Sequence, residues 1–397
     1  MRIEPDLKFI EYLKSAGGDT LKKCYQCATC SVVCPLGTDE SPFPRKEMIW
    51  AQWGLKEKLV ADADVMLCHQ CGDCTAYCPR GAKPGDVLGA IRAYAYTHFG
   101  WPQGLARFVS EGKNLPLIIG IPALLVLVVW YLSGGMHLPA SGHVDLGNFF
   151  GEGLYFGFTK NVLIIDAIFV PAFFFAVFAA YRGVSNMWRS MSAQLPAGSD
   201  FRPSVKQFTI AFLWPVIKET LAHKRFQECG ANKNRTNGHM PLLFSFIALL
   251  AVTSYSFVRK DVWGLLDPAM HGPLHLGDPA KILANIAAVA LIVGIAIIWA
   301  NRSRMEEEGK ATPTYYDWFL IAEIATVGVT GLLAELTRLI NIPVLAYLFY
   351  YLHLVSILML FIYMPYTKFA HMVYRTFAMA FERYRESTFA HPAKEQA

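Results

Sequence analysis

The first 80 residues contain two copies of one cysteine motif. The copies read Cys24-Tyr-Gln-Cys27-Ala-Thr-Cys30-Ser-Val-Val-Cys34-Pro35 and Cys68-His-Gln-Cys71-Gly-Asp-Cys74-Thr-Ala-Tyr-Cys78-Pro79. Three thiolates spaced by two residues bind one face of a [4Fe–4S] cubane, and in proteins with two such clusters the fourth cysteine, followed by proline, ligates the other cluster. The sequence therefore predicts two iron–sulfur clusters with crossed ligands.

The crossed arrangement assigns four cysteines to each cluster. One cluster is expected on Cys24, Cys27, Cys30 and Cys78, and the other on Cys68, Cys71, Cys74 and Cys34. Zinc is the alternative metal, but structural zinc sites usually combine two separated C-x₂-C pairs, which this doubled run does not resemble. Crossed ligation would bring the two clusters close together, as electron relay requires. The remaining cysteine, Cys229, stands alone and is expected to be an ordinary thiol.

The last long apolar run contains a histidine. His353 lies within YLFYYLHLVSILMLFIYMPY, and an ionisable side chain in such a run is expected to have a function because its burial in lipid without a partner is costly. His371 follows 18 residues later, which is five helical turns, so both imidazoles would share one face about 27 Å apart if Pro365 leaves the helix straight. This spacing predicts two stacked b-type haem sites.

Bis-histidine ligation of haem requires partners from other helices. His239, at the start of the third apolar run, is expected to pair with His371. His223 is the next candidate for His353, although its position predicts a place near the membrane surface. The number of haems, one or two, therefore stays open.

Two acidic residues, Asp166 and Glu323, also fall within apolar runs. Oxidation of a quinol releases protons, so either carboxyl group could accept one. The alternative role is a polar contact between helices.

Six apolar runs must position these residues. Each is long enough to cross a hydrocarbon core, which needs about 20 helical residues; they lie near 115–132, 161–181, 240–258, 282–300, 318–339 and 342–366. The 397-residue chain is 54% hydrophobic and only 17% charged, against roughly 25% charged residues in soluble domains. This balance excludes a disordered chain and argues against a purely soluble one.

The predicted fold is all-α in two parts. Residues 1–113 are expected to form an α-helical dicluster ferredoxin domain, with a helix over 43–60 between the motifs, and residues 114–397 a six-helix transmembrane cytochrome b domain. The stretch 208–217 is apolar but too short to span, and Pro215 interrupts it, so an interfacial helix is expected there.

The basic residues predict the orientation. If the cysteine-rich part is cytoplasmic, 31 of the 36 Lys and Arg residues lie on the inner side, as the positive-inside rule requires. Both termini would then be cytoplasmic, at the inner membrane. No signal-peptide pattern precedes the cysteines. The positive charges form no single stripe, so membrane lipid is expected as a partner and nucleic acid is not.

The sequence lacks the motifs of a complete soluble-substrate enzyme. It has neither a G-x-G-x-x-G nucleotide fingerprint nor a G-x₄-G-K-[ST] loop, which argues against flavin bound by a Rossmann fold and against ATP bound by a P-loop. The chain is therefore expected to carry electrons as one subunit of a larger oxidoreductase.

The motifs resemble known families in both parts. The first 110 residues, with C-Y-Q-C-x-T-C-x₃-C-P and L-C-H-Q-C-x₂-C-x₂-C-P-R, resemble the C subunit of heterodisulfide reductase. His353 and His371 are similar to the haem-ligand pair on the last helix of gamma-type cytochrome b subunits of respiratory nitrate reductase. That family carries both partner histidines on one transmembrane helix, whereas His223 and His239 flank a polar segment here.

The fusion of these two parts resembles the C subunits of quinone-interacting membrane-bound oxidoreductases (the Qmo family) of sulfate-reducing microorganisms. The resemblance implies two cytoplasmic flavin and iron–sulfur partner subunits related to the A subunit of heterodisulfide reductase. It also implies menaquinone as substrate and adenylylsulfate reductase as acceptor. The alternatives are the membrane arm of another heterodisulfide-reductase-like or sulfite-reductase-linked complex, and a membrane anchor for a ferredoxin that carries no haem.

Overall fold

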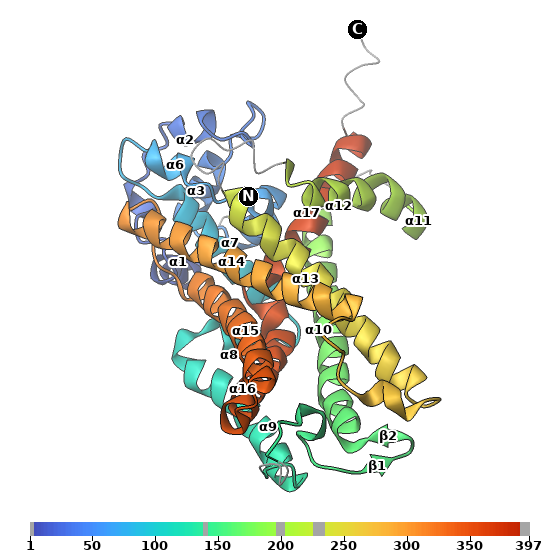
Figure 1. Cartoon of the computed structure of the whole chain (residues 1–397). Helices are drawn as coiled ribbons and strands as arrows, with labels where there is room; N and C mark the ends of the chain where they lie inside the picture. The colour runs from blue at the N-terminus through green and yellow to red at the C-terminus, as the bar shows by residue number, and fades with distance from the viewer. Residues whose placement is uncertain (1–3, 138–141, 196–202, 225–234, 390–397) are drawn as a thin grey trace.

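The structure, a computed structural model, describes residues 4–137, 142–195, 203–224 and 235–389. Within these residues the chain is almost entirely helical, and strands occur only in the hairpin of β1 (Leu154–Tyr155) and β2 (Phe158–Thr159). A cluster of short helices sits at one end of a bundle of long ones (Figure 1). The prediction of an all-α chain with six helices long and apolar enough to span a membrane is confirmed. Cys229 lies outside the described residues.

The short helices form the head. They are α1 (Leu7–Ser15), α2 (Thr29–Val32), α3 (Arg45–Gln52), α4 (Lys56–Val60), α5 (Ala63–Leu67), α6 (Asp73–Ala76), α7 (Pro84–Phe99) and α8 (Gln103–Ser110). Their core includes the fully buried Leu13, Met48, Leu88 and Ile91. The side chain of Asp6 caps α1 by accepting a hydrogen bond from the backbone N–H of Phe9 at 2.9 Å.

The single helix predicted over 43–60 is wrong in its bounds. The structure begins α3 at Arg45 and separates it from α4 at Trp53–Leu55. Gly54 has φ +67°, and a Cβ there would lie 2.9 Å from the backbone nitrogen of Asp6. A left-handed residue ends a helix, and glycine adopts that conformation without steric cost.

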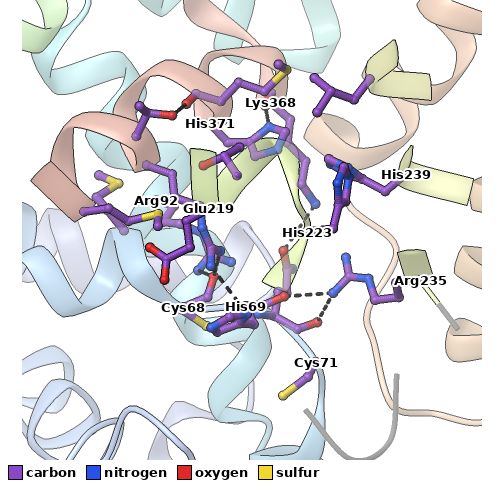
Figure 2. Close-up of a pocket in the computed structure, with 18 of the residues that line it drawn as sticks. Cys68, His69, Cys71, Arg92, Glu219, His223, Arg235, His239, Lys368 and His371 are labelled. Atoms are coloured by element: carbon purple, nitrogen blue, oxygen red, sulfur yellow. Dashed lines mark hydrogen bonds between the residues drawn. The ribbon is translucent and has the colours of Figure 1, made fainter. Parts of the chain in front are cut away.

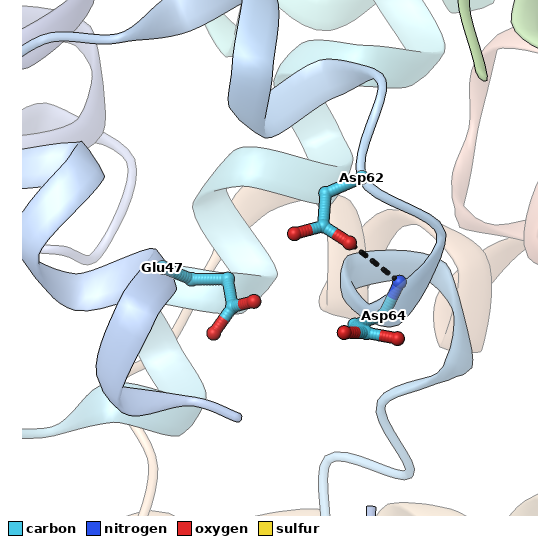
Figure 3. Close-up of side chains that lie close together, drawn as sticks. All are labelled: Glu47, Asp62 and Asp64. Atoms are coloured by element: carbon cyan, nitrogen blue, oxygen red, sulfur yellow. Dashed lines mark hydrogen bonds between the residues drawn. The ribbon is translucent and has the colours of Figure 1, made fainter. Parts of the chain in front are cut away.

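Three buried carboxyl groups lie together in the head (Figure 3). Glu47 of α3 faces Asp62 and Asp64 at the start of α5, and the Lys46 ammonium lies 3.3 Å from Glu47 Oε1 and 3.2 Å from Asp62 Oδ2. Burial, followed by the charge of Asp62, raises the pKa of Glu47 to about 9. The raised pKa favours the protonated form of Glu47 at neutral pH, where Lys46 pairs with the two aspartates.

Six long helices form the body. They are α9 (Leu115–Leu132), α10 (Lys160–Ser192), α13 (Thr236–Phe257), α14 (Pro279–Glu307), α15 (Tyr315–Leu339) and α16 (Pro343–Tyr363). Large apolar side chains of α9 face outward, with Leu117, Leu124 and Leu132 between 56% and 76% exposed. An apolar surface of this kind is unfavourable in water and suits lipid.

Two of these helices, α10 and α14, continue well beyond their apolar runs. The polar extension of α10 reaches Ser192, where Met187 and Met191 are buried against the head residues Met66 and Tyr96. Hydropathy detects only the lipid-facing part of a helix, so the sequence could not show that α10 also packs on the head.

The last predicted span ends in a break that changes the histidine geometry. The helix α16 stops at Tyr363, Thr367 is extended (φ −98°, ψ 179°), and α17 (His371–Phe389) follows in contact with α5 of the head. The expectation of one straight helix carrying His353 and His371 on a common face is therefore wrong. Pro365 supplies the reason, because proline cannot donate the hydrogen bond that would continue the helix.

The segment between the second and third spans contains the short helix expected at 208–217. Residues of α11 (Val205–Gln207), a π-helical turn (Phe208–Leu213) and α12 (Trp214–Leu221) form one continuous rod. Its buried residues, Phe212 and Val216, pack in the same cluster as Tyr384 of α17. Its position at the membrane interface remains a prediction.

Candidate functional site

The eight cysteines of the two motifs line two separate small cavities of about 20 Å³ each. One cavity is lined by Cys24, Cys27, Cys30 and Cys78, and the other by Cys34, Cys68, Cys71 and Cys74. Each cavity thus takes three cysteines from one motif and the fourth from the other motif. The grouping in space is the one that crossed ligation predicts, and four thiolates around one point are the donor set of a [4Fe–4S] cluster.

Both motifs have the same backbone conformation. Gln26 and Ala28 have φ of +61° and +69°, and the corresponding Gln70 and Gly72 have φ of +51° and +89°. These turns start α2 and α6, which carry the third cysteine of each motif and contact each other. Left-handed non-glycine residues are costly and concentrate where a ligand must be enclosed, so the repeated strain fits two metal centres.

Thiolates without a bound cation are poorly suited to this packing. Burial raises the pKa of Cys30 to about 11 and that of Cys34 to about 12. A hydrogen bond can stabilise a thiolate at another position, since the backbone N–H of Gln70 donates to Cys68 Sγ at 3.3 Å. Because only the thiolate is a metal ligand, the positive charge of iron is what would stabilise four buried thiolates at each site.

Two adjoining cavities lie next to the second cysteine group. Their volumes are about 180 and 160 Å³, and His239 and His371 line both of them. The first is also lined by Cys68, Cys71 and His223 (Figure 2). The head loop and the histidines therefore share one cavity.

His239 and His371 face each other as the sequence predicts. Their ring centres are 6.5 Å apart. Metal–imidazole bonds of about 2 Å would place the centres of two rings on one metal about 6 Å apart. Burial, and then the neighbouring His239, lowers the pKa of His371 to about 3, so its ring is neutral at pH 7. Neutral imidazole is the form that binds iron.

Hydrogen bonds assign the tautomers. His223 Nδ1 lies 3.1 Å from the Leu221 carbonyl oxygen, and His223 Nε2 lies 3.0 Å from His239 Nδ1. If each Nδ1 donates, the lone pair of His239 is on Nε2. His371 Nδ1 lies 2.5 Å from the carbonyl oxygen of Lys368, so its lone pair is also on Nε2. Metal-bound histidines typically donate their other N–H in this way.

The structure does not bring His223 to His353. His353 Nδ1 lies 3.1 Å from the Val327 carbonyl oxygen and 3.3 Å from Thr330 Oγ1, and its ring packs on Gly331, where a Cβ would lie 2.8 Å away. Among the described residues no histidine contacts His353. The pairing of His223 with His353 is therefore wrong, because the segment that carries His223 packs beside α13 and α17 instead.

The two acidic candidates lie apart from the cavities beside His371. Asp166 of α10 lies beside Asp261 and Lys260. Glu323 of α15 is only 8% exposed, and its Oε1 has no hydrogen-bond partner within the part of the chain that the structure describes. Their roles in proton transfer stay predictions.

Comparisons with known proteins agree with the cysteine pattern. Residues 20–82 match the 4Fe-4S dicluster domain family. The C subunit of the H(2):CoB-CoM heterodisulfide,ferredoxin reductase from Methanothermobacter thermautotrophicus is 41% identical over 58 residues, and that from Methanothermobacter marburgensis is equally similar. The head of this chain is an iron–sulfur electron-transfer domain related to these proteins. The match covers 14% of this chain and 31% of each relative. No solved structure matches the chain.

Three arginines converge on the second cluster loop of this dicluster domain. The guanidinium of Arg375 donates to the Cys68 carbonyl at 3.1 Å, Arg92 donates to the same oxygen at 3.5 Å, and Arg235 donates to the carbonyls of His69 and Gln70 at 2.8 and 3.0 Å. Sequence reasoning missed all three. The sequence contained one indication of this role: Arg375 lies four residues after His371 and therefore on the same face of a helix.

Proposed function

We propose that the chain is the membrane electron-transfer subunit of a quinol-linked oxidoreductase, with one haem b and two [4Fe–4S] clusters. The observation that carries the proposal is the shared cavity, in which Cys68 and Cys71 of the second cysteine group lie together with His239 and His371. Haem and clusters, when bound, supply one-electron oxidation and reduction. The chain's own residues would hold these groups in contact across the boundary between head and body.

Each residue of the shared cavity has a stated role in this proposal. His239 and His371 would hold the haem iron, and His223 would orient His239 through the hydrogen bond between their rings. The cationic Arg92, Arg235, Lys368 and Arg375 also line the cavity, where they would face the carboxylates of a haem. We assign no haem to His353, since no second imidazole lies beside it among the described residues.

The direction and partners follow from the resemblance of the two parts to known families. Electrons would pass from menaquinol through haem and the two clusters to two cytoplasmic flavin and iron–sulfur subunits related to the A subunit of heterodisulfide reductase. The acceptor beyond them would be adenylylsulfate reductase. The head and both termini would face the cytoplasm. Exposed Tyr25, Cys27 and Tyr77 beside the first cysteine group support an exit of electrons at that surface.

A spectrum with metal analysis tests the proposal. The full chain, purified anaerobically in detergent, is expected to contain eight irons in clusters and one haem, with a b-type reduced-minus-oxidised difference band. His239→Leu and His371→Leu should lose the band, and the exposed-loop control His275→Leu should retain it. A chain with eight cluster irons and no haem would refute the cytochrome part and leave a membrane-anchored ferredoxin.

A further inference from the structure

A third cavity lies between the head and the body, apart from the histidines. Its volume is about 380 Å³, within the range of about 300–1,000 Å³ typical of small-molecule sites. Its walls come from α1, α7, the end of α8 and the start of α15. Gly112 and Tyr315, which line it, are the first residues of the first and fifth spans. The cavity therefore lies at the level where the membrane begins.

The lining combines aromatic rings with hydrogen-bonding groups. Tyr12, Tyr96, Tyr315 and Tyr316 contribute phenol side chains, and the Tyr316 hydroxyl lies 3.1 Å from Thr97 Oγ1. Phenols offer a flat apolar face together with a polar tip. A planar ring with two polar oxygens is the kind of head group that such a wall accommodates.

The cavity is adjacent to both predicted electron carriers. Gln70, between Cys68 and Cys71 of the second cysteine group, lines it, and so does Lys368. Lys368 Nζ donates to Gln70 Oε1 at 3.2 Å, and the Lys368 carbonyl accepts the bond from His371. A molecule in this cavity would thus touch one residue of the cluster loop and one that holds the haem-ligand candidate.

Three carboxyl groups line the cavity. Asp86 is 7% exposed, and its Oδ2 accepts hydrogen bonds from the Thr312 backbone at 3.0 Å and from Thr312 Oγ1 at 2.7 Å. Glu111, also in the lining, is exposed. Asp317, by contrast, is paired with Arg302 and Lys368. Asp86 and Glu111 are therefore the lining acids placed to take up protons.

We propose that this cavity binds the head group of a lipid-soluble quinol. The proposal rests on the proposed function and gives its substrate a site. Oxidation breaks the two O–H bonds of the quinol and releases two electrons and two protons. The two electron acceptors would be the cluster that the second cysteine group would hold and the haem that His239 and His371 would hold, each of which takes one electron when bound. The protons pass through Asp86 and Glu111 to water.

Filling the cavity tests the proposal. Ala93 of α7 is 7% exposed and lines the cavity, so Ala93→Phe places a ring where the head group would lie. Tyr316→Phe removes only a hydroxyl and serves as the milder variant. Ala269→Phe and Tyr181→Phe, at exposed positions that line none of the three cavities, are the matched controls, and Glu323→Gln tests the alternative acid within the spans.

The probe is 2-heptyl-4-hydroxyquinoline N-oxide, a fluorescent quinol analogue, titrated against the purified full chain. Ala93→Phe is expected to weaken binding by at least about tenfold, and Tyr316→Phe by about threefold to tenfold. Both controls should bind as the unmodified chain does. Reduction of the chain by the soluble naphthoquinol menadiol should slow in the same order, whereas dithionite should reduce every variant fully.

The outcomes distinguish failure of the cavity assignment from failure of the proposed function. Unchanged binding in Ala93→Phe and Tyr316→Phe would overturn the assignment of the cavity, and loss of binding in Glu323→Gln would move the site to that carboxyl group. An unmodified chain that contains haem, yet neither binds the probe nor is reduced by menadiol, would overturn the quinol link itself.

Discussion

Replacing His223 by leucine is expected to weaken haem binding without abolishing it. The His223 side chain is 2% exposed, and its Nε2 lies 3.0 Å from Nδ1 of His239. Leucine cannot accept the proton of His239 Nδ1, so the ring of His239 loses the contact that fixes its tautomer and orientation. His239 itself stays in place to bind iron.

The expected loss of haem affinity follows from two independent considerations. Removing the group that holds a metal-bound histidine typically lowers metal affinity by about 10–100-fold, which corresponds to about 1.4–2.8 kcal/mol. Removing one partner of a buried hydrogen bond costs about 1–3 kcal/mol. The two ranges coincide, so the dissociation constant of haem is expected to rise by about one to two orders of magnitude.

Haem content and haem transfer provide the assay. Haem per chain is measured in the unmodified protein and in His223→Leu, His223→Gln and His239→Leu, together with the rate of haem loss to excess apomyoglobin. His223→Gln keeps an acceptor oxygen and should recover most of the affinity, whereas His239→Leu should contain no haem. Complete loss of haem in His223→Leu, with haem retained in His239→Leu, would refute the assigned roles and make His223 the ligand.

Four further substitutions test three predictions about the head. Cys78→Ser is expected to alter the EPR signal of the cluster at the first motif, and Cys34→Ser the signal of the cluster at the second motif, because each cysteine lines the cavity formed by the other motif. If each substitution instead altered the cluster at its own motif, crossed ligation would be contradicted. Arg375→Gln removes a charge 3.1 Å from the Cys68 carbonyl and should lower the midpoint potential of that cluster by about 50–100 mV in an EPR redox titration, whereas an unchanged potential would exclude the arginine's influence. The pKa of Glu47, raised by burial to about 9 from its ordinary value of 4.5, means that the folded head holds a proton that the unfolded chain has released. Stability should therefore fall between those pH values by up to about 1.4 kcal/mol per pH unit, and Glu47→Gln should flatten this dependence in thermal unfolding; an equal slope in both proteins would contradict a buried neutral Glu47.

Much of the fold could be predicted because the signals were local. The motif at Cys24–Cys34 and its repeat carry their spacing in the sequence, and an apolar run such as 282–300 has no charge. The chain's hydropathy therefore located each span, with α9 correct at both ends. The ends of α10 could not be predicted, since its polar extension is stabilised by contacts with the distant residues Met66 and Tyr96.

The candidate site was harder to predict because long-range packing decides it. The pairing of His239 with His371 was predicted from depth alone, and the structure places their rings 6.5 Å apart. Pro365 marks the break in the sequence, but the direction that the chain takes after Thr367 depends on where α17 packs. The contact of His223 with His239 depends on the turn after α12. Spacing along the chain contains neither piece of information.

The break after α16 has a consequence for biogenesis. The cavity beside the second cysteine group is closed by α17, which begins at His371 and is the last helix described in the chain. A ribosome must therefore synthesise all six candidate spans before His371 can meet His239. A nascent chain halted before residue 371 would already possess all eight motif cysteines and every span, yet only one of the two facing imidazoles. Cluster insertion could thus begin early in synthesis, whereas the proposed haem could be held by both imidazoles only after α17 has been made.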